Sequence, residues 1–154
     1  MNEYEEKFKL YLQKNNIDAE HLSFQQSCHS VEEAAKAANA KLEDFVKNIC
    51  IVDAQGNLIV AIVKGEDRAS TNDVAKVLNI QRLRIATPEE ILEKTGYPCG
   101  GTPSFGYSAT FLIDTKVMEK EIDYSGGGSE NSLLKISTKE LQRANSGKIV
   151  RIRK

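Results

Sequence analysis

Tryptophan is absent from this chain of 154 residues, and aromatic side chains make up only 6% of it. The core should therefore consist mainly of Ile, Leu, Val and Ala. Hydrophobic residues account for 40% of the chain and charged residues for 28%, as in an ordinary globular protein. The length fits one domain, and we expect residues 1–154 to form it.

Cysteine and histidine are scarce as well. The chain has three cysteines, Cys28, Cys50 and Cys99, and two histidines, His21 and His29. Because no CxxC pair occurs, we expect neither a metal site nor a disulfide framework. We expect no cofactor either. Cys28 and His29 are adjacent, but they lack the second ligand pair that a metal would need. Unpaired thiols fit the cytoplasm, which keeps cysteines reduced.

Neither a large excess of one charge nor a long apolar run is found. The formal net charge is −1, which does not indicate a protein that coats nucleic acid broadly. Contact with RNA should be limited to a small basic patch, and no DNA partner is expected. Residues 1–9 are charged and lack the apolar segment of a signal peptide. No run approaches the roughly 18 apolar residues of a membrane span, so no membrane partner is expected.

Helix and strand patterns alternate along the chain. Two segments rich in β-branched residues, 46–53 and 58–64, predict a hairpin. Apolar residues occupy both the odd and the even positions of its strands. Both faces of the hairpin should therefore be covered by helices or by more sheet. Capping signals at Ser30 and Thr87 predict helix starts. Other helical patterns lie in residues 2–14, 42–45, 70–78, 115–118 and 138–145, and other strand patterns in residues 21–26, 82–85, 109–113, 120–124, 132–137 and 148–152. We predict an α+β fold with a mixed, largely antiparallel sheet that is curled toward a barrel and surrounded by helices.

Lys47 stands near the start of a strand that is otherwise apolar. It shares its parity with Ile49 and Ile51, so its side chain points to a face that is buried further along. One interpretation is an edge lysine that reaches solvent. The other is a cation that lines a cleft and holds a phosphate or carboxylate. The residues alone leave both open.

Residues 96–107 (GYPCGGTPSFGY) have the composition of a loop. Gly100 and Gly101 allow backbone to approach a ligand closely, and N–H groups there can stabilise the oxyanion of an acyl transfer. An ordinary surface loop is the alternative. Cys99 lies in this loop far from either histidine in sequence, so we interpret it as a structural residue and not as a nucleophile.

A second glycine loop consists of Gly126, Gly127, Gly128 and Ser129. Its N–H groups could bind phosphate in a backbone nest. A strand follows it where a P-loop has a helix, so a hairpin turn is the alternative. Residues 148–154 alternate basic and apolar side chains, which is typical of a half-exposed strand and could also offer RNA a weak basic patch.

Taken in order, these features resemble one family. Residues 42–52, with Lys47 before a buried strand, are similar to the first strand of the YbaK/prolyl-tRNA-synthetase-associated editing domains. Residues 95–106 resemble their T-G-Y…G-G…P…G loop. Residues 126–152 resemble their closing strand, capped helix and strand. The similarity extends over about residues 20–152.

This resemblance implies a trans-acting aminoacyl-tRNA deacylase, an enzyme of translation fidelity. It would hydrolyse the ester of Ala, Cys, Ser or Thr on a non-cognate tRNA, with tRNA-Pro as the expected tRNA. It implies Lys47, Gly100 and Gly101 as catalytic residues. The implied substrate contacts are Thr102, Pro103, Ser104, Gly126, Gly127, Gly128 and Ser129. The acceptor end of a mischarged tRNA is the implied partner, with an aminoacyl-tRNA synthetase as a second candidate. A water, a ribose hydroxyl or the substrate's own side chain would attack the ester.

Two departures from the family pattern bear on the shape of the pocket. Ser104 stands where the family often has proline, with Pro103 one position earlier. Tyr107 stands where some relatives have histidine. Both affect which amino acid would be removed more than they affect the class of reaction. The alternatives are a module that binds the tRNA acceptor end without turnover and a small-molecule hydrolase unrelated to tRNA.

Overall fold

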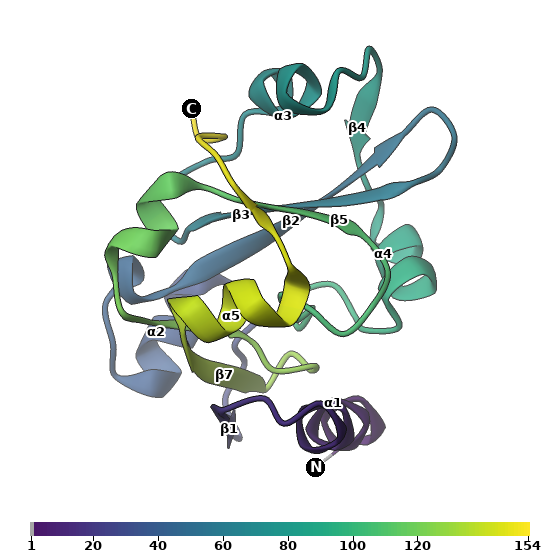
Figure 1. Cartoon of the computed structure of the whole chain (residues 1–154). Coiled ribbons are helices and arrows are strands. Elements are labelled where there is room, and N and C mark those ends of the chain that lie inside the picture. Colours follow the sequence, from purple (N-terminus) through teal and green to yellow (C-terminus); the bar gives the residue numbers. More distant parts are fainter. Residues whose placement is uncertain (1) are drawn as a thin grey trace.

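Two open β-sheets form the framework of the chain in a computed structural model that describes residues 2–154 (Figure 1). The first has five strands in the order β4-β2-β3-β5-β8, and the second has three in the order β1-β7-β6. The strands are β1 (Ala19–Ser23), β2 (Val46–Asp53), β3 (Leu58–Lys64), β4 (Leu83–Ile85), β5 (Thr110–Ile113), β6 (Ile122–Gly126), β7 (Ser132–Ser137) and β8 (Lys148–Ile149).

Most strand pairs are antiparallel, and the mixed α+β architecture agrees with the prediction. Strand β2 pairs antiparallel with β3 and β4, whereas β5 is parallel to both β3 and β8. The expectation of a sheet curled toward a barrel is wrong. Strands β4 and β8 remain at the edges of the first sheet and β1 and β6 at the edges of the second, so neither sheet closes on itself.

The last strand is shorter than the pattern of residues 148–152 predicts. Only Lys148 and Ile149 pair with β5. The backbone amides of Ile152 and Arg153 donate instead to Asp114 Oδ1, at 2.8 and 3.2 Å. The chain leaves β5 here and forms a single antiparallel bridge between Arg153 and Ala69. The alternation of residues does not reveal this change of partner.

Five α-helices and two short 3₁₀ helices connect these strands. They are α1 (Glu3–Lys14), α2 (Val31–Ala38), α3 (Thr71–Leu78), α4 (Pro88–Thr95), α5 (Thr138–Asn145), η1 (Leu42–Asp44) and η2 (Thr115–Glu119). Each α-helix begins after a residue whose side chain accepts a hydrogen bond from an amide of the first turn: Asn2, Ser30, Ser70, Thr87 and Ser137. These caps explain why the helix starts were predictable from sequence.

The β2–β3 hairpin lies at the centre of the structure and is covered on both faces, as predicted. All seven residues of β3 are buried. Ile59, Ala61 and Val63 pack with Val74 of α3 on one face, where the core is aliphatic.

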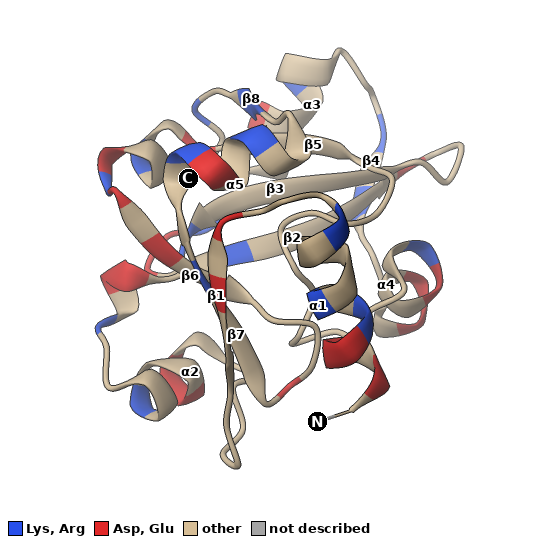
Figure 2. Ribbon diagram, turned by 60° about the horizontal axis from the view of Figure 1, so that its bottom comes forward, with Lys and Arg blue, Asp and Glu red and all other residues tan. Residues whose placement is uncertain are grey.

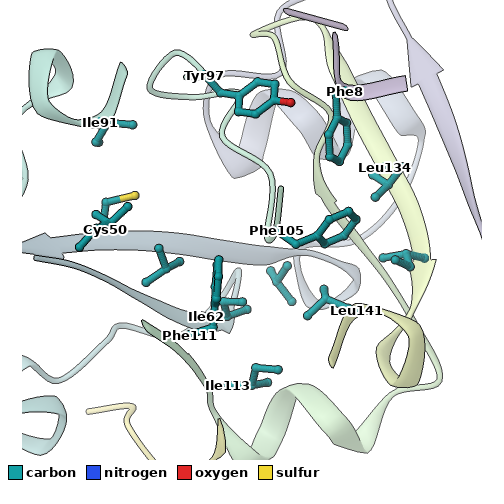
Figure 3. Packing of buried hydrophobic residues seen from close by; sticks show 14 of the residues in the cluster. Phe8, Cys50, Ile62, Ile91, Tyr97, Phe105, Phe111, Ile113, Leu134 and Leu141 are labelled. Carbon is teal, nitrogen blue, oxygen red and sulfur yellow. The ribbon is translucent and has the colours of Figure 1, made fainter. Parts of the chain in front are cut away.

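The opposite face of the hairpin is partly aromatic (Figure 3). Phe8 of α1 contacts Tyr97 and Phe105, with ring centroids 5.7 and 5.4 Å apart. The aliphatic core predicted from composition is therefore correct for the α3 side only. Phe8 and Tyr11 of α1 thus attach this helix to Tyr97 and Phe105 of the loop after α4.

Charges of both signs are mixed along α1, α2, α4 and α5 (Figure 2). None of these helices carries charges of one sign only. Within residues 2–154, no helix is both long and apolar enough to cross a membrane.

Candidate active site

A cavity of about 390 Å³ opens where the start of β2 meets the two glycine loops and the N-terminal end of α2. Its walls come mainly from four parts of the chain: residues 28–32, residues 45–49, the loop residues Cys99, Gly100 and Thr102, and residues 124–126 of β6. Ala34, Gly65, Ile91 and Leu133 complete them. The cavity is of the size that small-molecule sites usually have.

Lys47 of β2 lines this cavity and is partly buried. No ion pair or hydrogen bond of its ammonium group is found among residues 2–154. Lys64, on the paired strand β3, differs: its Nζ lies 3.0 Å from Asp123 Oδ1 and is buried. One lysine of the hairpin is thus neutralised inside the protein, whereas the other is available to an anionic ligand.

Asn48 connects the strand of Lys47 to both neighbouring segments. Its Nδ2 donates to the Thr102 carbonyl over 3.0 Å, and its Oδ1 accepts from Ser104 Oγ over 2.7 Å. The hydroxyl oxygens of Ser104 and Ser125 are 2.5 Å apart. Because Ser104 is fully buried, this network has a structural role, and a proline at its position could not take part in it.

The two glycine loops pack backbone against backbone. A β-carbon at Gly101 would collide with the backbone of Ser129, and one at Gly126 would collide with the Thr102 carbonyl. The amide of Gly128 donates to the Gly101 carbonyl over 2.8 Å. The glycines are therefore required for contact between the loops, whatever they do for a ligand.

Not every amide of the first loop is available to a ligand. The Gly101 N–H donates to the Pro98 carbonyl over 3.0 Å. The amides of Gly100 and Thr102 have no hydrogen-bond partner within residues 2–154, and both residues line the cavity. These N–H groups are therefore free to receive a developing negative charge, as is that of Cys99, which also lines the cavity and has no hydrogen-bond partner within residues 2–154.

The sequence model of a family described as an aminoacyl-tRNA editing domain matches residues 25–144. This chain belongs to that family. An uncharacterized protein of Bacillus subtilis, YwhH, is 26% identical over 128 residues, which are 82% of this chain and 81% of YwhH. A proline–tRNA ligase of Oleidesulfovibrio alaskensis is 26% identical over 102 residues, 66% of this chain. The match covers 18% of that ligase, so the chain spans less than a fifth of its length.

Among solved structures, one of a proposed trans-editing enzyme for prolyl tRNA synthetase superimposes with a TM-score of 0.91. The two chains are 22% identical, and the superposition covers 100% of this chain and 99% of the other. At this identity the likeness shows that the fold is shared.

The residues implied by resemblance fall into two groups in this editing domain. Lys47, Gly100, Thr102 and Gly126 line the cavity. The others are buried and do not line it: Gly101, Pro103, Ser104, Gly127, Gly128 and Ser129.

Two contacts at the cavity of the editing domain were not predicted from the sequence. The contacts of Asn48 could have been suspected, because a buried amide inside an apolar strand needs partners. His29 was considered only as a metal ligand with Cys28; its contact with Glu130 could not be foreseen, because 101 positions separate two residues whose side chains meet at 3.2 Å. His29 also lies against Gly100, so a histidine is closer to Cys99 than the sequence indicated.

Buried hydroxyl and thiol groups around the cavity are held in their neutral forms. Burial raises the pKa of Cys28 to about 11 and that of Cys50 to about 12. Burial also raises the pKa of Tyr107 well above its usual range, and its hydroxyl donates to the Pro103 carbonyl over 2.6 Å. Across residues 2–154, no three His, Cys, Asp or Glu side chains come together as metal ligands.

Proposed function

We propose that the editing domain hydrolyses the ester that joins a small amino acid to the terminal ribose of a mischarged tRNA, with residues 1–154 acting as one domain. The observation that carries this proposal is the unpaired, partly buried Lys47, which lines the same cavity as Gly100 and Thr102. A cation and two free amides in one cavity suit an ester attached to a phosphate backbone.

Each of these groups has a part in the proposed reaction. Lys47 holds the acceptor-end phosphate or orients the ester. The amides of Gly100 and Thr102 receive the carbonyl oxygen as it gains negative charge, in the manner of an oxyanion hole. Asn48 keeps Thr102 in place through its carbonyl. The rate enhancement then comes mainly from positioning and electrostatics.

A small aminoacyl group fits the composition of the cavity wall. Val31, Ala34, Phe45 and Leu133 line it, and the last three are buried. Because buried side chains are held by their neighbours, they cannot move aside to enlarge the cavity. They would therefore exclude large amino acids by size, as in double-sieve editing. We propose Ala, Cys, Ser or Thr as the amino acid. The relatives named as proline–tRNA ligases favour tRNA-Pro as the carrier and a prolyl-tRNA synthetase as a second partner.

Incubation of the purified protein with tRNAs mischarged with Ala, Cys, Ser or Thr tests this proposal. Ester loss is followed against the spontaneous rate, with Lys47→Ala and Lys47→Arg in parallel. We expect fast loss on one or two substrates, abolished in Lys47→Ala with the unfolding midpoint unchanged. No ester loss on any substrate with tRNA still bound would favour a module that binds the acceptor end without turnover. Full activity of Lys47→Ala would reject the role of this lysine.

A further inference from the structure

We propose that His29 is the acid–base group of the cavity, oriented by Glu130 and placed against Gly100. This inference rests on the proposed ester hydrolysis. His29 lines the cavity that also contains Lys47. Its Nδ1 lies 3.2 Å from Glu130 Oε1. Both side chains are about half exposed, so solvent and substrate can reach the imidazole.

Backbone contacts place the two side chains side by side. The amide of Cys28 donates to the Glu130 carbonyl over 2.5 Å, and the amide of Phe24 donates to the Asn131 carbonyl over 2.7 Å. Asn131 Nδ2 donates to the Gln26 carbonyl over 3.0 Å. The segment before His29 is therefore fixed along the turn that carries Glu130. The backbone thus brings the side chains of His29 and Glu130 within reach of each other.

Gly100 supplies the third part of the arrangement. A β-carbon there would collide with the imidazole of His29, because Nδ1, Cε1 and Cγ all lie against this position. The ring thus rests on the loop whose free amides are proposed to receive the carbonyl oxygen. An acid–base group beside an oxyanion hole is the arrangement that acyl transfer requires.

The hydrogen bond to Glu130 sets the tautomer of the imidazole. With the proton on Nδ1 donated to the carboxylate, Nε2 keeps its lone pair, and within residues 2–154 no hydrogen-bond partner of Nε2 is found. In the proposed step, Nε2 takes a proton from a water molecule as the water oxygen bonds to the ester carbonyl carbon. The bond from that carbon to the ribose oxygen then breaks, and the ribose oxygen takes the proton from Nε2. The products are the free amino acid and the tRNA hydroxyl.

Several ionisable groups face His29. Glu130 contacts it directly, and the same cavity is lined by Cys28, Glu32, Lys47, Cys99 and Tyr124.

Single-turnover deacylation from about pH 5 to pH 8, the range over which imidazoles titrate, tests this role in the wild type, His29→Gln and Glu130→Gln. Glutamine keeps a polar side chain of similar reach but does not titrate. We expect His29→Gln to lower the rate by about 10²- to 10⁴-fold, the usual contribution of a general base, and to abolish the decline of the rate toward acid pH. Glu130→Gln should also lower the rate, because the imidazole loses the carboxylate that orients it. A merely structural role of His29 would leave the decline in place.

Glu93→Gln, on the exposed side of α4, is the matched control and should behave as wild type. Unchanged thermal midpoints of all three variants exclude unfolding as the cause of a loss. An active wild type with an equally active His29→Gln would overturn the role of His29 and leave the proposed function intact. A wild type that hydrolyses none of the esters would overturn both.

Discussion

The amide of Gly128 donates a hydrogen bond of 2.8 Å to the carbonyl of Gly101 and thereby joins the two glycine loops. This contact is possible because no side chain separates the loops at Gly101 or Gly126. On this side of the cavity, two segments of backbone consequently pack directly against each other. Changes in either loop should alter the site as a whole.

Gly101→Ala should destabilise the protein by about 1–3 kcal/mol, the usual range for overpacking, and should lower deacylation per folded molecule. The added β-carbon has to push the backbone of Ser129 away. Urea unfolding together with activity measurements at 25 °C checks both effects.

Gly56→Ala is the control for this prediction. Gly56 has a φ of 83° in the turn between β2 and β3, and a β-carbon there meets only Lys94 Nζ at 3.7 Å. It should lose roughly 1–2 kcal/mol from backbone strain and keep its activity per folded molecule. An equal loss of activity in both variants would show that contact between the loops does not matter.

Glu5 of α1 does not line the cavity, but it holds the second glycine loop in place through a hydrogen bond to Ser129. It is buried and accepts hydrogen bonds from Ser129 Oγ at 2.8 Å and Ser23 Oγ at 2.5 Å. Glu5→Ala should cost about 1–3 kcal/mol, because it leaves these buried hydroxyls without their acceptor. Chemical denaturation measures the cost, and hydrogen exchange at residues 126–129 should accelerate. Unchanged exchange there would contradict the fastening role.

The pH dependence of stability provides a second test of Glu5. Burial raises its pKa, but hydrogen bonds from Ser23 and Ser129 and the charge of His21 outweigh burial, and the net pKa is lowered. A folded-state pKa below the unfolded value means a stabilising contribution that is complete above the unfolded value and lost as pH falls through the folded one. The free energy of unfolding should therefore fall less steeply toward acid pH in Glu5→Gln than in wild type.

Lys64 and Asp123 form a buried pair between the two sheets, and Asp123 Oδ2 has no hydrogen-bond partner within residues 2–154. Asp123→Ala should destabilise by about 3–5 kcal/mol, since it leaves a lysine buried without a counter-charge. The double variant Lys64→Met, Asp123→Leu should recover most or all of this loss. Thermal and urea unfolding of the single and the double variant, compared with wild type, measure both changes in stability. A double variant as unstable as the single one would show that the pair itself is needed.

Asp123 should also make the protein less stable as pH rises. Burial raises its pKa from 3.8 to about 6, although Lys64 and Lys120 act in the opposite direction. With the folded-state pKa above the unfolded one, the native state binds the proton more tightly, so this contribution is full below the unfolded value and is lost as pH rises to about 6. Asp123→Asn should remove that slope between about pH 4 and pH 6, as measured by unfolding at a series of pH values.

Cys99→Ser should retain most of the deacylase activity. The proposed reaction uses water and not a thiolate, although His29 lies against the neighbouring Gly100. Initial rates with the preferred mischarged tRNA, alongside Cys50→Ser as a buried control, check this. Complete loss in Cys99→Ser alone would identify the thiol as a nucleophile.

Binding of tRNA should weaken as salt concentration rises, because phosphate contacts release counterions. Lys47→Ala should lower the slope of log affinity against log salt by about 1, the value expected for one phosphate contact. Filter binding at a series of salt concentrations gives both slopes. An affinity that does not respond to salt would argue against phosphate contacts.

Much of the fold was predictable because its signals are local. Ser30 and Thr87 accept the hydrogen bonds that begin α2 and α4, and such caps depend on neighbours three residues away. The β2–β3 hairpin has the bounds that its β-branched residues predict. Strand β1 was less predictable, since its bounds follow from pairing with β7.

For the site, the sequence by itself determined the kind of residue at each key position: a lysine in an apolar strand, and two glycine loops without side chains. The tertiary structure alone decided which of them share a cavity. It separated Gly100 and Thr102, whose amides remain free, from Gly101, whose amide is bound to Pro98. It also brought His29 to Glu130 across 101 positions. Which amides stay free and which side chains meet depends on contacts between segments that are distant in the sequence. The pattern of residues within one segment does not determine these contacts.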